Sequence, residues 1–158
     1  MSGIIRHDWL THFLRVADTV AEKSHCVRRK VGCVIVRDKR IIATGYNGLP
    51  SGFPNCNETC WKPDRKSGTV LQDLPCEHAE KNALLQCAKY GTACESAIMV
   101  VSIMPCNECL KAIIQAGIRA VYYGKYYELD QSGEELREFL VSSAYTVSDF
   151  NMAMIMVN

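Results

Sequence analysis

Residue types that bind zinc, and one that moves protons, occur in two short motifs, His78-x-Glu80 and Pro105-Cys106-x-x-Cys109. Zinc prefers imidazole nitrogen and thiolate sulfur, and three protein ligands leave the fourth tetrahedral position open, as in catalytic sites. Bound zinc lowers the pKa of water towards neutrality, and a nearby carboxylate can then carry the proton onward. The two motifs therefore predict a metal centre that activates water, with Glu80 as its acid and base.

Each motif opens a stretch that is typical of a helix. Residues 78–90 are rich in good helix formers and stop before Gly91, and residues 106–116 place apolar side chains on one stripe. On an ideal helix His78 and Glu80 are about 200° apart, so they converge on one metal only if it lies beyond the helix end. We therefore expect both helices to point their N-termini at the metal, where the helix dipole favours thiolate.

The alternative to a catalytic centre is a non-catalytic zinc module that folds the chain or binds a partner. Without a metal, His78 would be a surface residue and the two cysteines small buried hydrophobes. Glu80 discriminates between these readings, because a structural site needs no carboxylate at that position.

Composition limits the class of protein. The chain has 158 residues, 48% of them hydrophobic and 22% charged, with a net charge of +1. We expect a single domain over 1–158 in the cytoplasm, because no apolar run could span a membrane and no leader is visible. The near-neutral charge argues against binding to a polynucleotide. Nine cysteines in a reducing compartment favour metal binding over disulfides.

Hydrophobic periodicity predicts alternating helices and strands, with a loop insertion bearing cysteines at about 49–77. This order implies an α/β fold: a three-layer α-β-α arrangement around a mixed five-stranded sheet. The expected elements are a helix at 4–22, a hairpin of 31–37 and 40–46, a helix at 78–90, a strand at 97–102, a helix at 106–116, a strand at 120–123, a helix at 133–142 and a last strand at 145–147 or 152–157.

A second set of cysteines lies in loops around the hairpin and the insertion. A structural zinc on these residues would hold the long loop in place. The alternative is that some of them are small buried residues, like the cysteines within apolar elements. The set comprises Cys26, Cys56, Cys60 and Cys76.

Together these motifs resemble the deoxycytidylate (dCMP) deaminases of the zinc-dependent cytidine deaminase superfamily, over about residues 5–125. The His-x-Glu and Pro-Cys-x-x-Cys pair is the signature of zinc nucleobase deaminases. The segments 31–36 and 43–48, followed by Pro50 and the cysteine-bearing insertion, are similar to the mononucleotide branch. The resemblance implies a cytidine deaminase-like fold.

The resemblance also implies an activity: hydrolysis of dCMP to dUMP and ammonia, which supplies dUMP for thymidylate synthesis. Zn²⁺ would be held by His78, Cys106 and Cys109, and Glu80 would transfer protons. The same chemistry on another base, such as cytidine or tRNA adenosine, is the nearest alternative. The substrate contacts implied are Asn47 to the deoxyribose, and the backbone N–H of Ala79 and carbonyl of Ser102 to the base edge. The candidates for the phosphate are Ser24, Arg28, Lys30 and Tyr126.

Relatives of this kind are often homo-hexamers that dCTP activates and dTTP inhibits. The resemblance therefore implies nucleotide effectors, with Mg²⁺ accompanying the triphosphate, and neither a polynucleotide nor a membrane as partner. The turn at 45–48 is expected to expose backbone N–H groups to such an effector. The candidate effector residues are Gly45, Tyr46, Gly48, Lys30 and Lys89.

Overall fold

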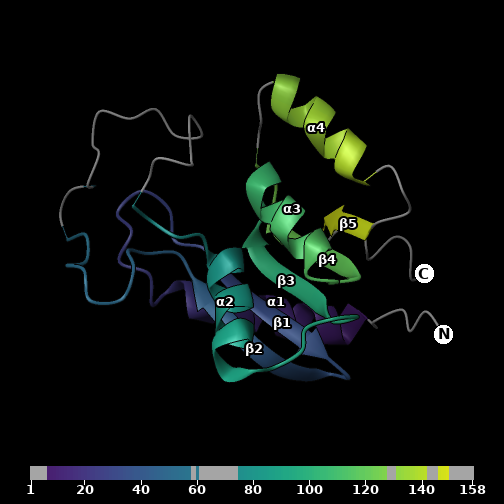
Figure 1. Ribbon diagram of the computed structural model, residues 1–158, viewed down its shortest axis with the longest axis horizontal. Coiled ribbons are helices and arrows are strands. Elements are labelled where there is room, and N and C mark those ends of the chain that lie inside the picture. Colours follow the sequence, from purple (N-terminus) through teal and green to yellow (C-terminus); the bar gives the residue numbers. More distant parts are fainter. Residues whose placement is uncertain (1–6, 58–59, 61–74, 128–130, 142–145, 150–158) are drawn as a thin grey trace.

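The computed structural model describes residues 7–57, 60, 75–127, 131–141 and 146–149 (Figure 1). Its sheet has the strand order β2-β1-β3-β4-β5. The strands are β1 Gly32–Arg37, β2 Arg40–Tyr46, β3 Ile98–Ile103, β4 Ala120–Lys125 and β5 Thr146–Asp149. β1 pairs antiparallel with both β2 and β3, whereas β4 runs parallel to β3 and to β5. The predicted α/β class with a mixed sheet is confirmed.

Helices cover both faces of this sheet. α1 (His7–Ala21) packs Leu10, Phe13 and Ala17 on the face that carries Val34 and Val100. The opposite face carries the alternate strand residues and is covered by α2 (Ala79–Tyr90) and α3 (Asn107–Gln115). The period of two along each strand sends successive side chains into these two cores. The result is the expected layering of helix, sheet and helix (Figure 1).

The hairpin between β1 and β2 turns at Asp38 and Lys39, as predicted. Both residues have positive φ, 51° and 61°. Two consecutive residues in this region form the tight turn whose twist matches that of the flanking strands. The hairpin brings the end of β2 beside the start of β1, where Gly32 pairs with Tyr46.

The C-terminal part adds α4 (Gln131–Val141), which packs against α3. Of the two expected positions for the last strand, the structure supports the first, since β5 begins at Thr146; residues 152–157 lie outside the described residues, as do residues 4–6 of the expected first helix. No helix within the described ranges is long and apolar enough to cross a membrane.

Candidate active site at two helix N-termini

Two helices begin at the same place with metal-binding residues in their N-cap positions. His78 caps α2 with φ −78° and ψ 154°, and Cys106 caps α3 with φ −73° and ψ 167°. Neither side chain makes the usual capping hydrogen bond to its own helix. The imidazole and the thiol therefore project beyond the helix ends, as the angular argument from the sequence requires.

The third ligand completes a compact group. His78 Nδ1 lies 3.5 Å from Cys106 Sγ and 3.4 Å from Cys109 Sγ, and the three ligand atoms all lie within 4.8 Å of one another. Zinc bonds of ~2.3 Å to sulfur and ~2.0 Å to nitrogen at a tetrahedral angle place the two atoms about 3.5 Å apart. The geometry therefore fits a zinc ion bound through Nδ1 of His78, with a fourth position open.

The sulfur of Cys106 is already polarised towards metal binding. A hydrogen bond from the Cys109 thiol lowers the pKa of Cys106, and the nearby His78 lowers it further. The same hydrogen bond, together with burial, raises the pKa of Cys109. Zinc binds thiolates, so one member of the pair is held in the form that the metal requires.

Glu80 lies beside this group in the first turn of α2 and is only 3% exposed. Burial raises the pKa of Glu80 to about 7, and the Cys106 thiolate contributes in the same direction. A carboxyl group with a pKa near the working pH can both accept and donate a proton, which suits a general acid and base. The role predicted for Glu80 therefore has a matching environment.

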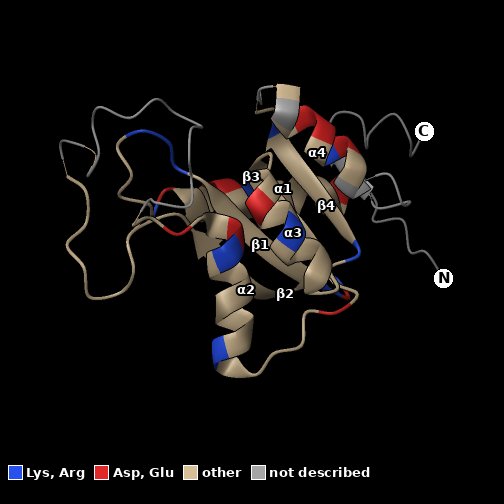
Figure 2. Ribbon diagram, turned by 45° about the horizontal axis from the view of Figure 1, so that its top comes forward, with Lys and Arg blue, Asp and Glu red and all other residues tan. Residues whose placement is uncertain are grey.

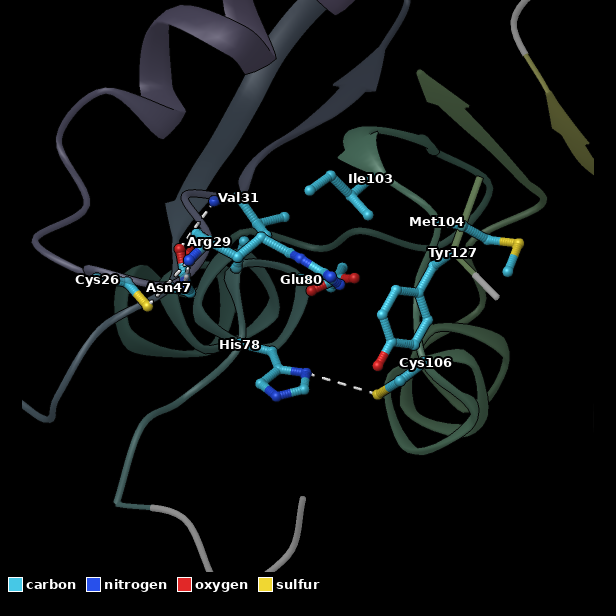
Figure 3. A pocket seen from close by; sticks show the side chains of 11 residues that line it. Cys26, Arg29, Val31, Asn47, His78, Glu80, Ile103, Met104, Cys106 and Tyr127 are labelled. Carbon is cyan, nitrogen blue, oxygen red and sulfur yellow. Dashed lines mark hydrogen bonds between the residues drawn. The ribbon is translucent and has the colours of Figure 1, made fainter. Parts of the chain in front are cut away.

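The site opens into a cavity at the protein surface, which gives a ligand access to the group. His78, Glu80, Cys106 and Tyr127 surround one space in the close view (Figure 3). The complete lining is Cys26, Arg29, Val31, Asn47, His78, Ala79, Glu80, Ile103, Met104, Cys106 and Tyr127.

Asn47 forms one wall of this cavity and also holds the neighbouring turn. Its Oδ1 accepts a hydrogen bond from Val31 N at 2.9 Å, and its Nδ2 donates to Arg29 O at 2.8 Å. Ser24 Oγ donates to the carbonyl oxygen of Asn47 at 2.8 Å, and Ser24 is 2% exposed. Ser24, a candidate to bind the phosphate, therefore uses its hydroxyl to stabilise this turn.

The basic and aromatic residues that reach the cavity are the immediate neighbours of those expected from the sequence. Arg29 and Tyr127 line it, with the Arg29 guanidinium 4.6 Å from the centre of the Tyr127 ring. Arg28 and Tyr126 are not among the lining residues, and Tyr126 instead donates a hydrogen bond to Glu134 at 2.7 Å.

The spacing of Arg29 from Val31 could have indicated that Arg29 lines the cavity. Arg29 precedes Val31 by two residues, and in an extended segment positions two apart share a side. Lys30, between them, is exposed and does not line the cavity.

Of the residues expected at the base edge, Ala79 lines the cavity and Ser102 does not. Ser102 is 5% exposed, and its Oγ accepts a hydrogen bond from Gly32 N at 3.0 Å. Its side chain therefore fixes the start of β1. The contacts of Ala79 and Ser102 to a base stay predictions.

The expected effector residues do not come together. Two N–H groups of the turn at 45–48 are paired, because Asn47 N donates to Val31 O and Gly48 N donates to Glu77 O. Gly45 is buried against α2, while Tyr46 is exposed. Lys89 lies in the last turn of α2, at the end remote from His78, with its Nζ 5.5 Å from the Tyr90 ring centre. Two N–H groups of this turn are therefore already used in backbone hydrogen bonds, and the effector site stays a prediction.

The base of the loop insertion is closed by a two-bond bridge between Gly48 and Glu77. Glu77 N donates to Gly48 O at 2.8 Å, and the reverse bond is 3.1 Å. This bridge places the residue before His78 beside the residue after Asn47. Sequence patterns gave no sign of it.

The second cysteine set gathers at this base without closing into a compact group. Burial raises the pKa of Cys76, and the other three cysteines of the set raise it further, so all four are electrostatic neighbours. Within the described ranges, only the group of His78, Cys106 and Cys109 has three ligand atoms within 4.8 Å of one another. All nine cysteines are free thiols.

Comparison with known proteins bears directly on this site. The sequence model of the cytidine and deoxycytidylate deaminase zinc-binding region matches residues 7–125, a span that includes both motifs. The chain belongs to this family.

Individual relatives agree with the family assignment. The chain is 37% identical over 152 residues to deoxycytidylate deaminase of Saccharomyces cerevisiae, covering 96% of this chain and 47% of that protein. It is 40% identical over 129 residues to deoxycytidylate deaminase of Mycobacterium phage D29, covering 76% of this chain and 97% of the phage protein. The chain thus spans about half the length of the yeast relative.

Among solved structures, dCMP deaminase from cyanophage S-TIM5 in complex with dCMP and dUMP is similar, with a TM-score of 0.75 and 30% identity. The match covers 92% of this chain and 98% of the phage chain. The family model describes a zinc-binding region, and the group of His78, Cys106 and Cys109, which could hold a metal ion, lies within the matched residues.

Proposed function

We propose that this chain catalyses the hydrolytic deamination of dCMP to dUMP and ammonia. The observation that carries the proposal is the buried Glu80 beside the three-ligand group of His78, Cys106 and Cys109, at a cavity that opens to the surface. The relatives of yeast and phage are named deoxycytidylate deaminases, and the similar cyanophage structure contains dCMP and dUMP.

His78, Cys106 and Cys109 would hold Zn²⁺, which supplies a Lewis acid and a water of lowered pKa. Glu80 accepts a proton from the water that attacks C4 of cytosine and delivers a proton to N3. Glu80 then helps to transfer a proton to the departing amine, so that dCMP and water give dUMP and ammonia. Burial of Glu80 supports both roles, because a carboxyl group with a pKa near 7 exchanges its proton readily.

Arg29, supported by Tyr127, is proposed to bind the 5′-phosphate of the substrate. Arg29 is the basic residue of the lining, and a guanidinium matches phosphate geometry with paired hydrogen bonds. The Tyr127 ring lies against the guanidinium and supports its position in the cavity lining. Asn47, in the same wall, is the proposed contact of the deoxyribose.

A second, structural zinc on Cys26, Cys56, Cys60 and Cys76 is also proposed. The mutual electrostatic influence of these thiols at the closed base of the insertion supports it. Their thiols are free, so a metal rather than a disulfide would join them.

Other features implied by the family resemblance stay predictions: one domain over 1–158 with its insertion, a cytoplasmic homo-hexamer, and control by dCTP, dTTP and Mg²⁺.

The test is ammonia release from dCMP, dCTP, deoxycytidine, CMP and deoxyadenosine by the zinc-loaded protein. We expect dCMP to give the highest kcat/KM, with deoxycytidine reduced because it lacks the phosphate. Ammonia release from deoxyadenosine or CMP in preference to dCMP would overturn the substrate assignment, and no release from any of the five would overturn the catalytic one.

A further inference from the structure

Arg137 in α4 is a buried cation that the reaction described above does not use. α4 carries Glu134, Glu135 and Glu138 and this single basic residue (Figure 2). Arg137 is 8% exposed, and its Nη2 donates to the carbonyl oxygen of Pro105 at 2.6 Å. Its Nε and Nη1 are buried and have no hydrogen-bond partner within the described ranges.

Such a group is unfavourable for stability by itself. A guanidinium stays charged in proteins and offers five N–H donors, and burying it with most of them unpaired costs solvation free energy. The lowered pKa of Arg137, caused by burial, has the direction expected from this cost. A side chain required only for packing at this position would be apolar, so the charge of Arg137 calls for a separate explanation.

The position of Arg137 supplies one, because α4 is tied to the chain on both sides of Cys106. Arg137 binds the carbonyl of Pro105, the residue before Cys106. Asn107, the residue after it, donates from Nδ2 to Gly133 O at 2.8 Å. These two hydrogen bonds hold Cys106 in the extended conformation that directs its sulfur towards His78.

Electrostatics point to the same residue. The two thiolates of Cys106 and Cys109 would neutralise the charge of a bound Zn²⁺, so any further anion at the site would give it a net negative charge. Cys106 lies within electrostatic range of Arg137, as does the carboxylate of Glu134, which is bonded to Tyr126. A fixed cation here would offset part of this negative charge.

We propose that Arg137 is a positioning residue of the metal site, which fixes the Pro105 carbonyl, and with it the Cys106 sulfur, and offsets the negative charge of the thiolates. The inference rests on the proposed zinc centre but not on the identity of the nucleotide.

Three variants and one matched control test the proposal. Arg137→Met removes the charge and the donor while keeping an unbranched side chain, Arg137→Lys keeps the charge, and Arg137→Gln keeps a donor without the charge. Glu138→Gln removes a charge from an exposed position of the same helix. Each zinc-loaded protein is titrated with a chromophoric chelator, and each cobalt-substituted protein is examined for its thiolate-to-cobalt charge-transfer band.

We expect Arg137→Met to lower zinc affinity about 10- to 100-fold, as changes around first-shell ligands typically do, and to shift the cobalt band. Arg137→Lys should recover most of the affinity, Arg137→Gln less, and Glu138→Gln should match the unmodified protein. Zinc affinity and a cobalt band in Arg137→Met that equal those of Glu138→Gln would overturn the proposal.

If Arg137→Met loses its far-UV circular dichroism and so does not fold, the other two variants test the proposal. The proposal holds if Arg137→Gln loses zinc and Arg137→Lys keeps it. The proposal is wrong if both variants bind zinc as the unmodified protein does. An unmodified protein that binds no zinc would instead contradict the proposed function.

Discussion

A Cβ atom on Gly45 would lie 2.1 Å from the carbonyl oxygen of Ala79. Gly45 belongs to β2, and Ala79 is the first residue of α2, between His78 and Glu80. The strand therefore approaches the active-site end of the helix so closely that only a hydrogen fits. The positions of His78 and Glu80 depend on this contact.

Gly45→Ala should accordingly disturb both stability and the site. Overpacking of this kind typically costs about 1–3 kcal/mol, and relief of the clash moves the start of α2. We expect a lower urea midpoint and reduced zinc content. Gly48→Ala is the matched control, because a Cβ at Gly48 meets nothing within 4 Å. Equal midpoints for the two variants would show that the close approach does not constrain the fold.

Glu80→Gln should keep the fold and the zinc but lose activity by about 10²–10⁴-fold, because a general acid and base is removed. Glu108→Gln is a close control, since Glu108 also lies two residues after a metal ligand in the first turn of a helix. Glu108 is half exposed and pairs with Lys111. Ammonia release and zinc content check the prediction, which near-normal turnover by Glu80→Gln would contradict.

The raised pKa of Glu80 predicts a pH dependence of stability in protein stripped of metal. Between the ordinary value of 4.5 and about 7, the folded protein holds a proton that the unfolded chain has released. The free energy of unfolding therefore falls as pH rises through this window, by up to about 3 kcal/mol in total. Glu80→Gln should lack this component, so urea unfolding of both proteins from pH 4 to pH 8 should show a widening difference. A difference that stays constant with pH would mean that the pKa of Glu80 is not raised in the folded protein.

Arg29→Ala should raise KM for dCMP by about tenfold or more, the scale of one lost charged hydrogen bond, and should leave deoxycytidine nearly unaffected. Arg28→Ala distinguishes the two neighbouring arginines. A larger effect on KM for dCMP from Arg28→Ala than from Arg29→Ala would favour the assignment made from the sequence.

Metal analysis should give about two zinc ions per chain if the second cysteine set binds metal. Cys56→Ser should lower the content by one, whereas Cys94→Ser, which changes a partly buried cysteine outside both sets, should retain both ions. About one zinc in every protein would remove the second site.

The grouping of His78, Cys106 and Cys109 beside Glu80 could be predicted from the sequence because it depends on spacing within two short motifs. His78 and Glu80 are two residues apart, and the requirement that they converge at a helix end follows from helical geometry alone. The elements around them were predictable for a similar reason, since periods of two and 3.6 reflect which side chains are buried.

The substrate side was less predictable because it depends on contacts distant in sequence. Gly48 pairs with Glu77, and this pairing consumes the N–H group that sequence inspection assigned to an effector. The choice between Arg28 and Arg29 depends on the direction of one turn, which Asn47 fixes by hydrogen bonds across 16 and 18 residues. Local periodicity contains no information about such bonds.

The bridge between Gly48 and Glu77 also bears on how proteins of this architecture can diversify. Because the chain leaves and returns at the same pair of backbone bonds, the segment at 49–76 can change in length or composition without altering the separation of Asn47 from His78. Lengthening such a closed excursion adds only a slowly growing entropic term, about 0.6 kcal/mol for each doubling. The residues of the candidate active site and those of the insertion are thus free to evolve at different rates. A loop taken from another protein could replace the insertion at this junction.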